Sequence, residues 1–140
     1  MIPKTIDMQL MRYINLFERI CRVSTTDCFV YNNVIIFAVP KSKVSLAIGK
    51  NGANMRKIGE VLRKRIKVIE MPQEGVGVKK FVEAVVDPIT FNKFEISNGM
   101  ATISAGRQSK AALIGRGRSR QKELEDILIK AFNIRKLRIS

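Results

Sequence analysis

The stretch that decides the fold is SLAIGKNGANMRKI, residues Ser45–Ile58. Its two glycines, Gly49 and Gly52, stand three positions apart with apolar residues on both sides. The first can end a helix, because a positive φ costs glycine little. The second lets the chain enter another helix, whose free N–H groups and positive dipole end then face the loop. The pattern predicts a helix–loop–helix whose bare main chain can hold a phosphate group.

A second copy of this pattern lies 66 residues further along the chain. Ile48-Gly49-Lys50 aligns with Ile114-Gly115-Arg116, and Asn32-Asn33 aligns with Asn98-Gly99. Turn-forming pairs of this kind between apolar runs indicate two-residue β-hairpin loops. Recurrence of the whole pattern at a fixed offset predicts two domains of one design.

Each predicted unit has the order helix, strand, strand, helix, helix, strand, which is an α+β fold. The first comprises a helix from Thr5 to Arg22, strands at Cys28–Tyr31 and Val34–Val39, helices at Lys43–Ile48 and Ala53–Lys64, and a strand at Ile66–Glu70. The second comprises a helix at Val78–Val86, strands at Lys93–Ser97 and Met100–Ala105, helices at Arg107–Ile114 and Ser119–Phe132, and a strand at Arg135–Ile139. The domains are therefore expected at 1–72 and 78–140, with a short turn-rich linker at 73–77.

The charge of the chain favours an anionic partner. There are 26 Lys and Arg residues against 12 Asp and Glu, for a net charge of +14. Residues 1–70 hold 13 basic and 5 acidic side chains and residues 71–140 hold 13 and 7, so the excess is not confined to a tail. Nucleic acid is the leading candidate. An anionic membrane surface and an excess that serves only solubility are the alternatives.

Several classes of enzyme and metal site fit the sequence poorly. Histidine is absent, which removes the commonest general base. Cys21 and Cys28 cannot alone supply the about four ligands of a zinc site; we expect buried, reduced thiols, with a disulfide as the alternative. The glycine pattern of a phosphate-binding P-loop also fails, because Val44 stands where its first glycine belongs. A non-catalytic binding protein without metal or cofactor is expected, and an RNA- or nucleotide-hydrolysing enzyme is the less favoured reading.

No membrane segment is expected from the sequence. No apolar run approaches the length that spans a bilayer. The first twenty residues are interrupted by charged side chains, unlike a signal peptide. The expectation is a cytoplasmic, monomeric protein.

The motif IGKNG, between two short helices and after a β-hairpin, resembles the IGxxG signature of a KH RNA-binding domain, and the helix-first order resembles its type II form. The resemblance implies that the loop clamps the backbone of about four nucleotides of single-stranded RNA, whose bases lie in an apolar groove. The groove wall would come from Val44, Ala47, Ile48 and the strand at Val34–Val39. The RNA-binding residues implied for the first unit are Val44, Ala47, Ile48, Gly49, Lys50, Asn51, Gly52, Arg56 and Lys57.

The second loop departs from the signature, because Arg118 stands where the second glycine belongs. Arg118 must either adopt an unfavourable backbone angle or reshape the loop. The region is nevertheless richer in arginine than the first loop, so we expect it to contact phosphate more through side chains. The residues implied here are Arg107, Lys110, Ile114, Gly115, Arg116, Gly117 and Arg118.

Two such domains in tandem, joined by a short linker, resemble the KH pair of the NusA family of transcription factors, in the short form found in archaea. That resemblance implies a role in elongation, pausing, termination or antitermination, with the nascent transcript as the bound RNA. Bacterial members also have a polymerase-binding domain and an S1 domain, to which nothing in this sequence corresponds, so direct contact with RNA polymerase stays open. A KH protein of the ribosome or of RNA processing is the alternative.

Overall fold

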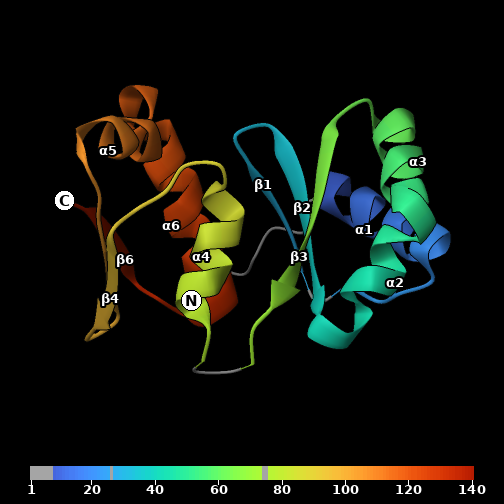
Figure 1. Cartoon of the computed structure of the whole chain (residues 1–140), viewed down its shortest axis with the longest axis horizontal. Helices are drawn as coiled ribbons and strands as arrows, with labels where there is room; N and C mark the ends of the chain where they lie inside the picture. The colour runs from blue at the N-terminus through green and yellow to red at the C-terminus, as the bar shows by residue number, and fades with distance from the viewer. Residues whose placement is uncertain (1–7, 26, 74–75) are drawn as a thin grey trace. The chain divides into compact units, whose positions relative to one another are not determined.

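The computed structural model describes residues 8–25, 27–73 and 76–140, and in it the chain divides into two compact units, Met1–Met71 and Pro72–Ser140 (Figure 1). The predicted helix cap at Thr5 and part of the predicted linker, residues 74–75, lie outside the described residues.

The first unit is a three-stranded sheet with helices on one side (Figure 1). Strand β2 lies in the middle, antiparallel to β1 and parallel to β3. At the β1–β2 turn, Asn32 and Asn33 have φ angles of 51° and 62°, the positive values that a two-residue hairpin turn requires. The elements are α1 Met8–Cys21, β1 Asp27–Tyr31, β2 Val34–Pro40, the 3-10 turn η1 Lys41–Lys43, α2 Val44–Ile48, the 3-10 turn η2 Lys50–Gly52, α3 Ala53–Leu62 and β3 Arg65–Met71.

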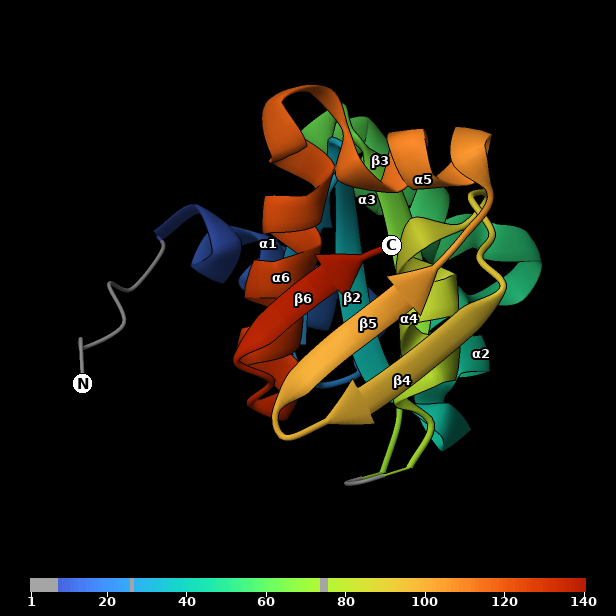
Figure 2. The ribbon, with the colours of Figure 1, turned by 90° about the vertical axis from the view of Figure 1, so that its left-hand side faces the viewer.

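The second unit repeats this topology, as predicted. Strand β5 is central, antiparallel to β4 and parallel to β6. Figure 2 shows the β4-β5-β6 sheet in front of α4 and α6. The elements are α4 Val78–Val86, β4 Lys93–Ser97, β5 Met100–Ser104, α5 Arg107–Ile114, the 3-10 turn η3 Arg116–Arg118, α6 Ser119–Phe132 and β6 Lys136–Ile139.

Three predicted helix bounds in the first unit need correction. The helix expected to run to Arg22 ends at Cys21, because Arg22 takes a left-handed conformation with a φ of 58°. The helix expected to run to Lys64 ends at Leu62, because Arg63 takes a left-handed conformation with a φ of 55°. The helix expected from Lys43 begins at Val44, since the three residues before it form a 3-10 turn. All three differences lie at element ends, where the hydrophobic pattern carries least information.

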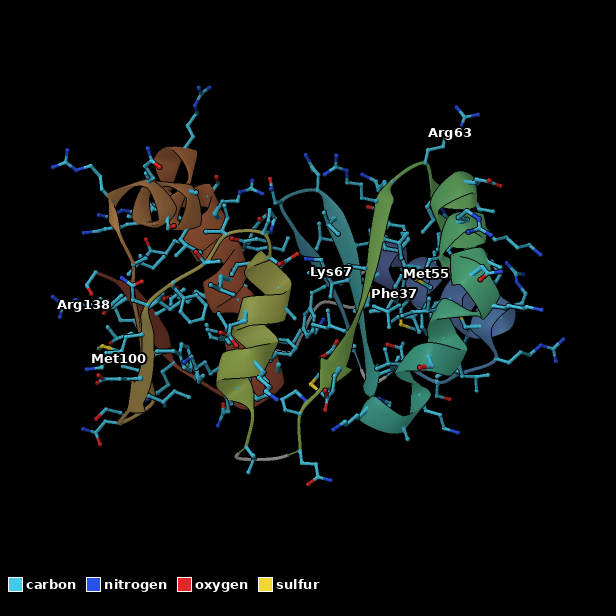
Figure 3. All side chains as sticks on the ribbon, in the orientation of Figure 1. Phe37, Met55, Arg63, Lys67, Met100 and Arg138 are labelled. Atoms are coloured by element: carbon cyan, nitrogen blue, oxygen red, sulfur yellow. The ribbon has the colours of Figure 1, made fainter. Side chains whose placement is uncertain are left out.

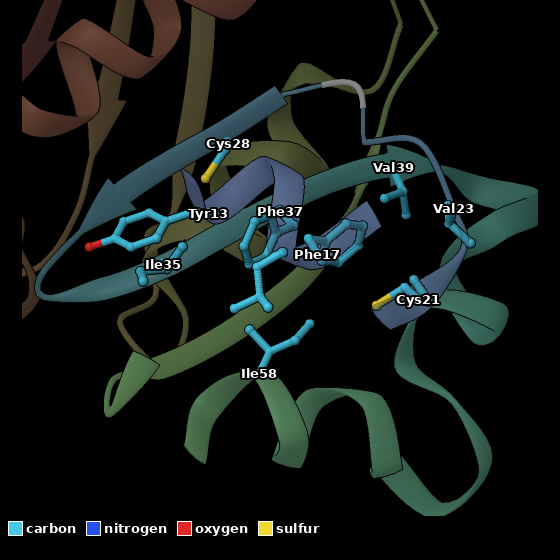
Figure 4. Close-up of a cluster of buried hydrophobic side chains, with 11 residues drawn as sticks. Tyr13, Phe17, Cys21, Val23, Cys28, Ile35, Phe37, Val39 and Ile58 are labelled. Carbon is cyan, nitrogen blue, oxygen red and sulfur yellow. The ribbon is translucent and has the colours of Figure 1, made fainter. Parts of the chain in front are cut away.

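The core of the first unit lies between its sheet and helices α1 and α3 (Figure 4). Phe17 of α1 stacks on Phe37 of β2 with 4.3 Å between ring centroids, and Ile58 of α3 packs against the same cluster. Cys21 and Cys28 are free and buried, which confirms that they are part of the core. Burial raises the pKa of Cys21 to about 11, because the thiolate would lose its hydration.

The core of the second unit includes buried residues on both sides of the loop between α5 and α6. Leu113 of α5 and Leu124 and Leu128 of α6 are fully buried, while Phe81 of α4 meets Phe132 edge to face at 4.9 Å. The loop between α5 and α6 is thus anchored on both sides by buried leucines.

Candidate nucleic-acid interface

The first glycine of the α2–α3 loop is required by geometry. Gly49 has φ 82° and ψ 170°, a region of backbone space that is essentially restricted to glycine. Its N–H donates to the carbonyl oxygen of Ser45 at 3.1 Å and so closes α2. A Cβ at this position would lie 2.8 Å from Cγ and 3.1 Å from the backbone nitrogen of Asn54. No other residue fits without moving the start of α3.

The second glycine of the loop is less constrained. Asn51 (φ 55°, ψ 28°) and Gly52 (φ 73°, ψ 19°) are both left-handed, a conformation that asparagine tolerates better than most residues. The Gly52 N–H donates to the carbonyl oxygen of Gly49 at 3.1 Å. A Cβ on Gly52 would meet Arg56 Nη1 at 3.7 Å, which is an ordinary contact. The first glycine is therefore required by both its backbone angles and its close contact with Asn54, whereas the second is favoured only by its left-handed angle.

A pair of alanine substitutions tests this difference. Gly49→Ala should lower the free energy of unfolding of the first unit by about 2–3 kcal/mol through backbone strain and the clash with Asn54. Gly52→Ala, which meets only the left-handed penalty, should cost about 1 kcal/mol. Urea denaturation followed by circular dichroism gives both values, and equal losses would contradict the assignment.

The second loop has the same backbone as the first despite its different sequence. Gly115 has φ 74° and ψ 170°, and a Cβ there would lie 2.9 Å from the backbone nitrogen of Arg120. Gly117 (φ 62°, ψ 25°) and Arg118 (φ 64°, ψ 22°) are left-handed. Of the two outcomes foreseen for Arg118, the structure has the first: the residue takes the unfavourable angle and the loop keeps its shape.

Each loop leads into a helix whose start carries no side-chain cap. Neither α3, which follows Gly52, nor α6, which follows Arg118, has a side-chain hydrogen bond at its N-cap. A helix leaves its first N–H groups without intrahelical acceptors, and these groups point toward the preceding loop. Together with the positive end of the helix dipole, they form a place where an anion is stabilised.

Cations surround the first loop at three positions. Lys50, within the loop, and Lys57, on the first turns of α3, are both exposed. Arg56 bends back, and its Nη1 donates a hydrogen bond to the carbonyl oxygen of Asn51. All three predicted basic residues of this unit thus lie at or next to the loop.

Asn54 holds the loop in place and was missed by sequence reasoning. Its Nδ2 donates to the carbonyl oxygens of Leu46 and Ala47 at 3.3 and 3.2 Å, which ties the start of α3 to the end of α2. The internal repeat could not reveal it, because Arg120 occupies the equivalent position in the second unit.

The expected groove wall in the first unit is smaller than the sequence indicated. Ala47 is fully buried, and Phe37 and Val39 of β2 are buried in the core, so they support the surface from beneath and do not form it. Val44 and Ile48 are partly exposed and remain as the apolar surface beside the loop. Along β2 the side chains from Ile35 to Val39 are all buried, so the strand presents little apolar surface to a ligand.

Three of the residues predicted for the second unit, Arg107, Lys110 and Ile114, lie along one face of α5. Arg107, Lys110, Ala111 and Ile114 line a shallow hollow of about 430 Å³. Their spacing of three, four and seven positions places them on one side of a helix. Ala111 was not predicted, although this spacing could have revealed it.

The loop beside this hollow carries further cations. Arg116 and Arg118 are exposed, and each lies within the loop itself. Arg120 forms an ion pair with Glu123 at 2.9 Å, so part of its charge is already balanced. The freely available charge at the second loop therefore comes from the two loop arginines.

The two ends of α3 differ in character. Figure 3 shows Met55 on the side of the helix that faces the sheet, where it packs on the core, and Arg63 projecting from the far end. Because the loop lies at the start of α3, Arg63 stands a helix length away from it.

Within residues 8–25, 27–73 and 76–140, no three His, Cys, Asp or Glu side chains are grouped so that they could hold a metal ion. Over the same residues, none of the helices combines the length and apolar character needed to cross a bilayer.

The loop geometry, the same topology in both units and the sequence motifs indicate one class of protein. A model of the KH domain family matches residues 11–139. The chain belongs to the KH domain family.

Within that family, the chain is similar to archaeal proteins named probable transcription termination protein NusA. The one from Halococcus morrhuae is 27% identical over 107 residues, which cover 76% of this chain and 75% of the relative. The one from Thermoplasma acidophilum is 24% identical over 139 residues, covering 96% and 94%. The crystal structure of APE1850 superposes with a TM-score of 0.65 at 28% identity, covering 96% of this chain and all of that one. The resemblance to a NusA-like KH protein is confirmed.

Proposed function

We propose that the chain is a pair of type II KH domains, at residues 1–72 and 78–140 with a linker at 73–77, that binds single-stranded RNA through both loops. The helix-first order of each unit, with its third strand parallel to the second, supports the type II assignment. Short tethering of two weak sites raises the effective concentration of the second once the first is bound.

One observation carries this proposal. The sequences GKNG and GRGR differ at three of four positions, yet the two loops have the same torsions and each precedes a helix without a side-chain cap. A shape that persists while side chains change is expected where the main chain itself does the binding. The ligand that suits bare N–H groups and adjacent cations is a phosphate backbone.

The role we infer is in transcription, in elongation, termination or antitermination, with the nascent transcript as the RNA. Support comes from the names of the archaeal relatives. The function is binding and not catalysis, the protein acts as a cytoplasmic monomer, and contact with RNA polymerase is an open part of the proposal. A KH protein of the ribosome or of RNA processing is the competing role, and sequencing of RNA cross-linked to the protein in cells separates the two.

The RNA-binding proposal is tested by fluorescence anisotropy with one RNA presented as a single strand and as a duplex. We expect tighter binding to the single strand, because bases must be splayed out beside the loop. Equal affinity for both forms would mean that the net charge alone attracts RNA, and the proposal would fail.

A further inference from the structure

The hollow on α5 is lined by two cationic side chains, Arg107 and Lys110. Arg107 is exposed and Lys110 is half-buried. In the part of the chain that the structure describes, neither side chain has an ion-pair or hydrogen-bond partner. A pair of cations beside a hollow, with no carboxylate to balance them, is available for an external ligand.

The corresponding surface of the first unit lacks one of these cations. At the offset of the internal repeat, Lys110 corresponds to Val44, and Ile114 corresponds to Ile48. Both pairs lie on the helix that leads into the loop. Arg107 corresponds to Lys41, which is also an exposed cation. The two units therefore present the same loop backbone beside surfaces that differ by one cation, since the first has Val44 where the second has Lys110.

The hollow offers both an apolar surface and hydrogen-bond donors. Ala111 and Ile114 provide the apolar part, on which the face of a base can lie, and Lys110 and Arg107 provide N–H donors at its side. A volume of about 430 Å³ falls within the range that small-molecule sites occupy.

Among the bases, guanine matches these donors best. Its O6 and N7 are neighbouring acceptors, and arginine or lysine facing them is the commonest specific contact to a base. Adenine and cytosine present an amino group on the same edge. This group is a hydrogen-bond donor, and lysine and arginine side chains have no acceptor for it. In a single strand these edges are open to the protein.

We propose that the hollow lined by Arg107, Lys110, Ala111 and Ile114 makes the second unit selective for guanine, whereas the first unit, with Val44 in the place of Lys110, has no such preference. This inference rests on the proposed binding of single-stranded RNA and adds which base one of the two units selects.

The test uses the full chain and uridine-rich single strands that carry one guanosine or, in its place, one adenosine. The wild-type protein should prefer the guanosine strand by about tenfold. Lys110→Val, which copies the first unit, and Lys110→Met, which keeps the aliphatic stem, should bring the ratio of the two affinities to about one, whatever affinity each variant loses for both strands through its missing charge. Circular dichroism verifies that both variants are folded.

Three results would overturn the inference. A wild-type protein that binds both strands equally has no guanine selectivity, although its RNA binding would stand. If the variants lose the same factor in affinity for both strands, and their affinity depends less on salt, Lys110 contacts a phosphate and does not select a base. Failure of the wild-type protein to bind either strand would refute the proposed function itself.

Discussion

Replacing Lys50 and Asn51 together by aspartate is expected to lower the affinity for single-stranded RNA by about hundredfold or more. A carboxylate about 4 Å from a phosphate costs about 1 kcal/mol in water and about 4 kcal/mol near a protein surface. Two such groups, and the loss of one ammonium, exceed the about 2.7 kcal/mol that a hundredfold change requires. The fold should survive, since aspartate tolerates the left-handed angle of Asn51.

The matched control places the same change of charge on α4. Lys79→Asp with Lys80→Gln also lowers the net charge by three, at exposed positions outside the proposed interface. Anisotropy at a fixed salt concentration compares the two double variants, because salt alone shifts such affinities strongly. If both lose the same affinity, the first loop has no special contact with RNA.

Phe37→Ala is expected to lower the free energy of unfolding of the first unit by about 3–5 kcal/mol. The side chain is fully buried at the centre of the core and stacks on Phe17. Its removal forfeits the buried apolar area and leaves a cavity that the central strand of the sheet cannot close by moving. Since whole domains have only about 5–15 kcal/mol of stability, the variant should lie close to unfolding.

Phe37→Leu serves as the control, because it removes less volume and should cost markedly less. Chemical denaturation of the full chain measures both variants, with the transition of the second unit as an internal reference. A loss below about 1 kcal/mol for the alanine variant would be incompatible with the described core.

Much of the second unit could be predicted from sequence because its helices have clear end signals. Val78–Val86, Arg107–Ile114 and Ser119–Phe132 have the expected bounds. Gly77 precedes the first of them, and Asp87-Pro88 follows it. Such residues act locally, through allowed backbone angles and a missing N–H donor, so they can be interpreted without knowing the tertiary structure.

The parts that sequence could not give depend on packing. Local preference disfavours a left-handed arginine, yet Arg118 takes that angle because buried leucines on α5 and α6 fix where the loop begins and ends. The position of Ala47 in the sequence predicts a groove residue, but its side chain is buried. Asn54 donates hydrogen bonds to carbonyl oxygens of the preceding helix. In each case the deciding contact lies in another element.

The buried thiols of the first unit also make a built-in reporter. The 140 residues include two cysteines, Cys21 and Cys28, and both belong to the core of the first unit. Both thiols are buried, and burial raises the pKa of Cys21, so that its reactive thiolate form is suppressed. An alkylating reagent should therefore reach them only when this core opens. The labelling rate would therefore report the opening of the first unit alone, since the second unit has no cysteine. Repeating the measurement with RNA would show by how much ligand binding slows that opening.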